Sequence, residues 1–242
     1  KIPSYMKNLQ ELITLLSLCP GLVVHLPLTF SDCEETAKAT LPSSDKRHRI
    51  PSSILEGMID GTRKFHEQDV EVKKEYYSSD PTARRVRYDS NLHVYKSKGK
   101  TAYWKDSLII PGFVSGHNEP EEIPEVCRKT SLEYINHVIK LEDTLLGLLS
   151  EALGLKPNNL QATKFDKGQT LICHYYPACP QPKLTLGIEK HTDPVFLTIL
   201  LQDQNGGLQV MCDNQWPMLH RLNMVWLLIL VTTFRSYQMT SL

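Results

Sequence analysis

The spacing of apolar side chains changes along this chain, and the change limits the folds that the chain can adopt. Residues 54–76 and 124–153 repeat apolar side chains at helical spacing. Residues 169–176 and 196–202 are instead short β-rich runs separated by turn residues. Long helices first and antiparallel strands later predict an α+β fold in which the helices flank a sandwich or barrel.

Local signals predict where these elements end and which strands pair. Ser53 and Glu56 have the spacing of a capping box at the start of the first helix, and Gly154 supplies a stop after the second. Residues 84–95 alternate as a strand, and residues 101–110 are the expected partner strand. A Gly-bearing turn before residues 208–211 predicts a hairpin with residues 196–202.

The composition excludes several classes of partner. The 27 Lys and Arg balance the 27 Asp and Glu, so no net field attracts nucleic acid or an anionic membrane. The apolar runs 12–18 and 224–231 are shorter than the ~18 residues of a membrane-spanning helix, and 12–18 lacks the flanks of a signal peptide. Six scattered cysteines are typical of reduced thiols, so we expect a cytoplasmic protein. Because Lys1 is not Met, we expect the chain to be incomplete at its start.

The tripeptide His191-Thr192-Asp193 is the main candidate for chemistry. In an extended chain, residues two apart point to the same face, so the imidazole and the carboxylate can converge on one ion. They would supply two ligands of the 2-His-1-carboxylate triad of non-haem Fe(II) oxygenases. The alternative is a surface His beside a turn-forming Asp-Pro. A zinc site at Cys173, His174 and Cys179 is not expected, because their spacing does not match structural zinc sites.

Longer segments around this tripeptide give a family resemblance. The run HTDPVFLTILLQDQNGGLQV follows HYYPACPQPKLTLG, and IPSSILEGMIDGTRKFHEQ and YDSNLHVYKSK stand upstream. The sequence from residue 50 to about 216 resembles the plant Fe(II)/2-oxoglutarate-dependent dioxygenases, most of all the 1-aminocyclopropane-1-carboxylate oxidase homologues. The resemblance implies an oxidoreductase of plant secondary metabolism that uses Fe(II), with 2-oxoglutarate and O2 as cosubstrates and ascorbate as an optional reductant.

The resemblance also assigns roles and parts of the chain. It implies that His191 and Asp193 bind the metal, that Tyr176 contacts 2-oxoglutarate, and that Leu200 and Leu208 are wall positions. His174 is expected to be a hydrogen-bonded strand residue. The expected fold is an incomplete double-stranded β-helix, or jelly roll, with flanking long helices. We expect four parts: a disrupted N-terminal region (1–49), the helical and strand N-terminal part of the fold (50–165), the first half of the jelly-roll core (166–216) and an out-of-frame tail (217–242).

The sequence departs from the family after Trp216. The family pattern requires a second His ligand and then an Arg-x-Ser that grips 2-oxoglutarate. His220 lies too close to His191 to be that ligand, and Arg235 is not part of an Arg-x-Ser. If the codons after Trp216 are regrouped by one base, Met224-Val225 must encode Gly. The codons that follow are degenerate, and their regrouped forms allow a sequence like that of the family. We therefore expect a frameshift there, and natural divergence of the sequence is the alternative.

Two functions remain open at this stage. The chain is either an oxidoreductase of the family that acts on a small organic metabolite and is impaired by truncation, or a non-catalytic truncated or pseudogene product. We expect residues 1–45 and 217–242 to be poorly packed. Lost strands would leave open sheet edges, so we expect the isolated chain to aggregate or to bind chaperones.

Overall fold

The structure is a computed structural model that forms two compact units. The first unit comprises residues 1–55, 140–163 and 192–242, and the second comprises residues 56–139 and 164–191. Helices α3 and α5 run from one unit into the other. The described residues are 22–25, 50–78, 86–90, 102–112, 119–152, 155–156, 158–162, 169–191, 193, 195, 197–209, 216 and 226–230.

The expected first helix is two helices, so the prediction of one helix over residues 54–76 is wrong. Helix α3 (Ser52–His66) ends before Asp69, and α4 (Val70–Lys74) begins after it. The Asp69 carboxylate accepts a hydrogen bond from the backbone N–H of Glu71 at 2.9 Å, and this N-cap starts a new helix within a continuous helical period. Ser53 lies inside α3 and does not cap it.

The second predicted helix is confirmed, because α5 spans Glu125–Ala152. In the second unit, α5 lies close to α3 at Gly61. A Cβ built on Gly61 would lie 2.3 Å from the Thr130 hydroxyl oxygen and 3.4 Å from the Cys127 Cβ. Glycine at this position therefore lets the two helices approach each other.

The second unit holds an antiparallel sheet in the order β2 (Arg87–Ser90), β4 (Asp106–Pro111) and β5 (Thr170–Tyr175). The predicted pairing of the strands within 84–95 and 101–110 is confirmed over these residues. The second of those predicted strands is interrupted, and its first part, β3 (Ala102–Tyr103), pairs in parallel with β6 (Thr185–Leu186). Two 3-10 turns, Pro120–Glu122 and Pro182–Leu184, complete the unit's regular elements among the described residues.

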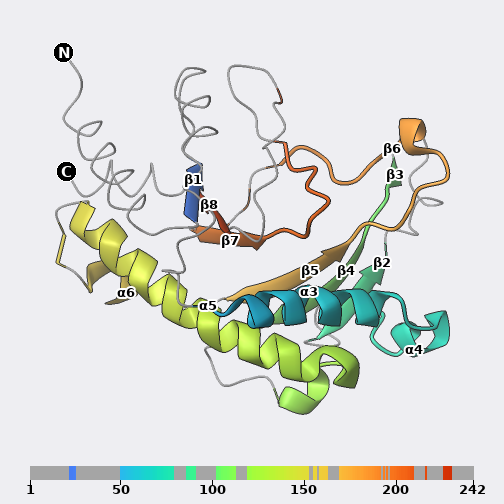
Figure 1. The fold of residues 1–242 in the computed structure, drawn as a ribbon, viewed down its shortest axis with the longest axis horizontal. Helices are drawn as coiled ribbons and strands as arrows, with labels where there is room; N and C mark the ends of the chain where they lie inside the picture. The colour runs from blue at the N-terminus through green and yellow to red at the C-terminus, as the bar shows by residue number, and fades with distance from the viewer. Residues whose placement is uncertain are drawn as a thin grey trace. The chain divides into compact units, whose positions relative to one another are not determined.

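One face of this sheet packs on α3, as Figure 1 shows. Phe65 of α3 contacts the ring of Tyr88 edge-on, with centroids 5.8 Å apart. His66 donates from Nε2 to the backbone carbonyl of Cys173 at 3.2 Å and stacks on Tyr175. The core of the unit comprises Met58, Phe65, Val86, Tyr88, Leu108, Ile110, Ile123, Cys127, Tyr134, Ile135 and Cys173.

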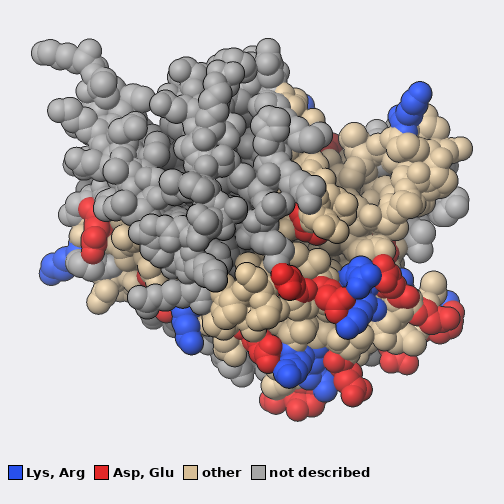
Figure 2. Space-filling model, in the orientation of Figure 1, with Lys and Arg blue, Asp and Glu red and all other residues tan. Residues whose placement is uncertain are grey.

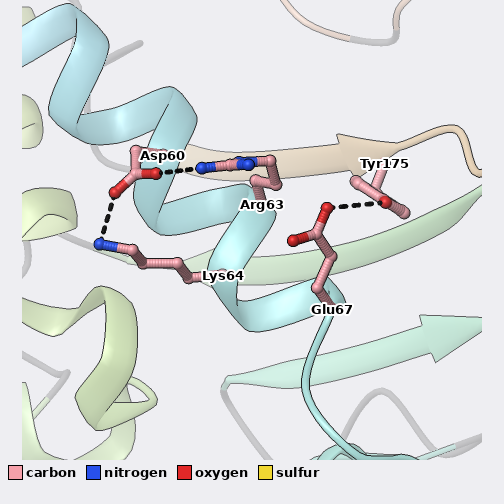
Figure 3. Close-up of polar contacts among 5 residues, drawn as sticks. All are labelled: Asp60, Arg63, Lys64, Glu67 and Tyr175. Carbon is pink, nitrogen blue, oxygen red and sulfur yellow. Dashed lines mark hydrogen bonds and ion pairs between the residues drawn. The ribbon is translucent and has the colours of Figure 1, made fainter.

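The outer surface of α3 carries exposed polar pairs (Figure 3). Asp60 accepts hydrogen bonds from Arg63 and Lys64 at 2.7 and 2.6 Å. The Tyr175 hydroxyl of β5 donates to Glu67 at 3.3 Å. Exposed pairs of this kind contribute little to stability. On the face drawn in Figure 2, acidic and basic side chains of the described residues are interspersed rather than segregated.

The first unit holds a sheet in the order β1 (Leu22–His25), β8 (Trp226–Leu230) and β7 (Leu197–Leu201). Strand β8 is parallel to β1 and antiparallel to β7. Parts of residues 1–45 and 217–242 thus pair in this sheet, over β1 and β8. The expected poor packing of the two ranges stays a prediction, because most of their residues lie outside the described part. The backbone of β8 pairs with that of β7 and so satisfies this edge of β7. Short helix α6 (Asn159–Ala162) and the end of α5 bury Leu145, Leu146, Leu149 and Leu160.

Two expectations about the strands of the first unit change. Each residue of β7 is half-buried, whereas a strand buried on both faces was expected. No hairpin strand forms at Leu208 and Gln209 beyond an isolated bridge, and residues 210–211 lie outside the described part. Among the described residues, no helix is both long and apolar enough to span a bilayer.

Candidate functional site

Strand alternation builds a pocket on the face of the β2-β4-β5 sheet opposite α3. Side chains of consecutive strand residues point to opposite faces, so the buried Tyr88 and Leu108 leave their neighbours Asp89 and Ser107 on the other face. Asp89 pairs with Ser107, and Ser107 pairs with His174, so the three form one row across the sheet.

This row is polar and is joined to an apolar row beside it. The Ser107 hydroxyl and His174 Nδ1 share a hydrogen bond of 2.9 Å. His174 is thus a hydrogen-bonded strand residue, as expected. Ile109 and Ile172 pair in the adjacent row on the same face. The floor of the pocket therefore offers both hydrogen-bonding and apolar surface.

The walls of the pocket come from β3 and from the segment after β6. Tyr103 and Lys105 line one side, and Ile188, Glu189 and His191 line another, around a volume of about 380 Å³. Two hydrogen bonds of the intervening Trp104 hold these walls together. Its backbone N–H donates to the Leu186 carbonyl at 2.7 Å, and its indole N–H donates to the Pro177 carbonyl at 3.0 Å.

Charged and titratable groups make the pocket electrostatically mixed. Partial burial lowers the pKa of Lys105, and the Asp89 carboxylate opposes this shift. The Tyr103 hydroxyl donates to a carboxylate oxygen of Glu189 at 2.5 Å, and this bond raises the pKa of Tyr103. The pocket can thus engage a polar group at one end and an apolar body over the three isoleucines, Ile109, Ile172 and Ile188.

His191 presents a defined tautomer in this wall. Its Nδ1 lies 2.7 Å from the backbone carbonyl oxygen of Glu189. A carbonyl oxygen can only accept, so Nδ1 carries the hydrogen and, in the neutral ring, Nε2 carries the lone pair. Metal-binding histidines usually donate their other ring N–H in this way. The arrangement suits a metal ligand.

Asp193 belongs to the first unit, whereas His191 is the last residue of this part of the second unit. The Thr198 hydroxyl of β7 donates to Asp193 Oδ2 at 2.7 Å. Ligating carboxylates commonly have such a hydrogen-bond partner. The arrangement of His191 and Asp193 side by side stays a prediction. Across the described part of the chain, no three His, Cys, Asp or Glu side chains gather as a metal cluster.

The remaining predicted site residues lie apart from the pocket wall or outside the described part. Tyr176 is 51% exposed, and it is absent from the pocket lining. Its ring lies against Gly187, where a Cβ would come within 3.1 Å of the Tyr176 Cε1 atom. Leu200 and Leu208 are half-buried in the first unit. His220 and Arg235 lie outside the described residues.

Sequence reasoning missed the polar residues of the pocket. Tyr103, Lys105 and Ser107 lie on or between short strands that carry no recognisable motif. Asp89 lies within the run YDSNLHVYKSK, but the resemblance assigned it no role. Alternation alone could have placed Asp89 and Ser107 on one face. Their common row with His174 depends on the register between strands far apart in sequence, which the sequence does not state.

Comparison with known proteins gives a consistent family. Residues 167–230 match the 2OG-Fe(II) oxygenase superfamily. Deacetoxyvindoline 4-hydroxylase from Catharanthus roseus is 47% identical over 169 residues, which cover 70% of this chain and 41% of that protein. 1-aminocyclopropane-1-carboxylate oxidase homolog 11 from Arabidopsis thaliana is 49% identical over 170 residues, which cover 70% of this chain and 46% of that protein. The chain thus spans less than half the length of these curated relatives.

Solved structures are similar in fold. The crystal structure of JOX2 in complex with 2OG, Fe and JA has a TM-score of 0.68 at 24% identity, covering 87% of this chain and 65% of that chain. The 2-oxoglutarate complex of dioxygenase for auxin oxidation 1 from Arabidopsis thaliana has a TM-score of 0.61 at 17% identity, covering 87% and 79%. The family implies Fe(II), 2-oxoglutarate and O2. The resemblance identified from the sequence is confirmed, because the chain contains a segment of the 2OG-Fe(II) oxygenase superfamily at residues 167–230 and is similar to these plant proteins.

Proposed function

We propose that this chain carries the first half of the active site of an Fe(II)- and 2-oxoglutarate-dependent oxygenase for a small organic metabolite. The observation that carries the proposal is the position of His191 in the pocket wall, inside the segment that matches the superfamily. Its Nδ1–H donates a hydrogen bond to the Glu189 carbonyl. We also propose that the strands belong to an incomplete jelly roll. The fold similarity to solved oxygenases supports this architecture.

The donor set suits iron. An imidazole nitrogen and a carboxylate oxygen are two of the three ligands of the facial triad that leaves coordination positions open. His191 would bind through Nε2 and Asp193 through its carboxylate, each held by a hydrogen bond to a neighbour. Bound Fe(II) would couple the oxidative decarboxylation of 2-oxoglutarate by O2 to oxidation of the substrate.

The pocket would place the organic molecules beside His191. Its volume of about 380 Å³ lies within the usual range for small-molecule sites, on the order of 300–1,000 Å³. Ile109, Ile172 and Ile188 would cover an apolar body. Tyr176, two residues beyond His174 on the same segment, would help to place 2-oxoglutarate. The similarity to deacetoxyvindoline 4-hydroxylase supports hydroxylation as the reaction class.

The test is succinate release from 2-oxoglutarate in the presence of Fe(II), ascorbate and O2. We expect the 242-residue chain to release succinate no faster than free Fe(II). We expect a chain with the reading frame restored after Trp216, and continued to the length of the relatives, to release it faster, and His191→Ala to abolish that gain.

A restored chain that folds but never exceeds free Fe(II) would favour the non-catalytic alternative, a truncated or pseudogene product. The His137→Ala variant is the matched control, because His137 is a half-buried imidazole on α5 that does not line the pocket. Its succinate release should equal that of the restored parent.

A further inference from the structure

We propose that Tyr103 and Glu189 are positioning residues for the His191 imidazole. Two hydrogen bonds link the three residues. The Tyr103 hydroxyl donates to a carboxylate oxygen of Glu189 at 2.5 Å, and His191 Nδ1–H donates to the Glu189 backbone carbonyl at 2.7 Å. All three line the same pocket. We call this chain of contacts the strap, and its role for a metal rests on the proposed function.

The strap is anchored on a fixed base. Tyr103 ends strand β3, and its pairing with Leu186 of β6 is parallel. The next residue, Trp104, is hydrogen-bonded through both its backbone N–H and its indole N–H to the segment that carries β6. Tyr103 is therefore held where regular pairing with this segment ends.

The segment after β6, residues 187–191, has little regular structure to hold it in place. Residues 187–191 have no helix or strand structure, and Glu189, Lys190 and His191 are exposed. An irregular exposed segment keeps its backbone freedom unless contacts restrict it. The Tyr103 hydroxyl restricts Glu189 by its hydrogen bond to the Glu189 carboxylate. It so fixes the direction of the Glu189 backbone carbonyl, which accepts the hydrogen bond from His191 Nδ1–H.

The direction of that carbonyl decides which ring nitrogen of His191 can bind a metal. An unconstrained neutral imidazole favours the hydrogen on Nε2. The Glu189 carbonyl instead holds it on Nδ1, so Nε2 carries the lone pair. Residues that orient a metal-binding His in this way typically change metal affinity by about 10- to 100-fold when they are substituted.

The first test measures the tautomer of His191 in the metal-free chain. Long-range ¹H–¹⁵N NMR spectra of the imidazole, assigned with His191→Ala, report which nitrogen is protonated at a pH where the ring is neutral. We expect Tyr103→Phe and Glu189→Ala to shift the population from Nδ1–H towards Nε2–H. Glu189→Gln keeps a carbonyl acceptor for the Tyr103 hydroxyl and should retain the parent tautomer. Unchanged spectra in both Tyr103→Phe and Glu189→Ala would overturn the proposal.

The control is Tyr175→Phe, which removes another phenol-to-glutamate bond, at 3.3 Å, outside the pocket. It should leave the His191 spectrum unchanged. Equal thermal melting curves of all variants would show that the shift does not come from unfolding. A shift as large in Tyr175→Phe as in Tyr103→Phe would contradict a specific role of the strap.

The second test measures Fe(II) affinity by anaerobic titration. We expect Tyr103→Phe and Glu189→Ala each to weaken binding about tenfold, the double variant to lose no more than either, and Glu189→Gln to bind as the parent does. Affinities unchanged by Tyr103→Phe would contradict the role for a metal. If the parent itself does not bind Fe(II), the proposed function fails, whereas the tautomer shift still decides whether the strap orients His191.

Discussion

The contact between α3 and α5 provides a sharp test of the packing in the second unit, because two glycines on α3 face Thr130 at different distances. A Cβ at Gly61 would lie 2.3 Å from the Thr130 hydroxyl oxygen, and a Cβ at Gly57 would lie 3.5 Å from the Thr130 methyl carbon. The first distance forces a displacement, whereas the second is ordinary van der Waals contact. Gly61→Ala and Gly57→Ala are therefore a matched pair.

The expected energies follow from these distances. Replacing Gly by Ala inside a helix gains about 1 kcal/mol, and this gain applies to both variants. Overpacking at Gly61 costs typically about 1–3 kcal/mol. Displacing Thr130 also strains its hydrogen bond to the Cys127 carbonyl, which is 3.0 Å long and contributes about 1 kcal/mol. We expect Gly61→Ala to destabilise the unit by about 2 kcal/mol and Gly57→Ala to stabilise it by up to about 1 kcal/mol.

The reporter is the thiol of Cys127, which is 1% exposed and lies next to Gly61. Burial raises the pKa of this thiol to about 11, so it reacts only when the packing opens. Peptide-resolved thiol labelling should be roughly 30-fold faster in Gly61→Ala and slower in Gly57→Ala, since about 1.4 kcal/mol corresponds to tenfold. Adding Thr130→Ala should relieve much of the Gly61→Ala effect. Equal labelling rates in the two single variants would show that the helices do not meet as described.

Further predictions concern the same unit. Burial lowers the pKa of His66 to about 4, and its Nδ1 has no hydrogen-bond partner among the described residues. The unfolded chain, with an ordinary pKa near 6.5, therefore binds more protons between these values. The free energy of unfolding should be highest above pH 6.5 and should fall towards pH 4 by at most about 1.4 kcal/mol per pH unit. In His66→Gln, the urea midpoint of unfolding should change less with pH over this range. Tyr88→Phe removes a 2.8 Å hydrogen bond to the Asp106 carboxylate, and urea unfolding should show a loss of about 1.5–3 kcal/mol, whereas Tyr175→Phe should be near neutral.

The helices show what local sequence signals can and cannot predict. Helix α5 could be predicted to within one residue at each end because its apolar stripe is long and uninterrupted. The break between α3 and α4 was missed because the helical period continues through it. The Asp69 side chain competes locally for a backbone N–H and starts a new helix there.

The sheets show the limit set by pairing between distant segments. Strands β2, β4 and β5 could be expected from their composition, and the pairing of β2 with β4 could be expected because they are close in sequence. The pairing of β1 with β8 joins chain segments that no local signal connects. The reading of residues 217–242 as an out-of-frame tail also gave no reason to expect a strand at Trp226–Leu230.

The candidate site divides in the same way. His191, Asp193 and Tyr176 could be named because they stand in a motif with fixed spacing. Lys105, Tyr103 and Asp89 could not, because they reach the pocket only through strand register and through the β3–β6 pairing. The Tyr103 to Glu189 bond spans 86 positions of sequence and depends on that pairing.

Metal binding by His191 and Asp193 is the central claim, and anaerobic equilibrium dialysis of Fe(II) against the full chain tests it most directly. We predict one Fe(II) site whose affinity falls at least about tenfold in His191→Ala and in Asp193→Ala, because each substitution removes a ligand. His137→Ala, which removes an imidazole on α5 away from the pocket, should bind as the parent does. Fe(II) binding that is equal in the parent, His191→Ala and Asp193→Ala would contradict the claim.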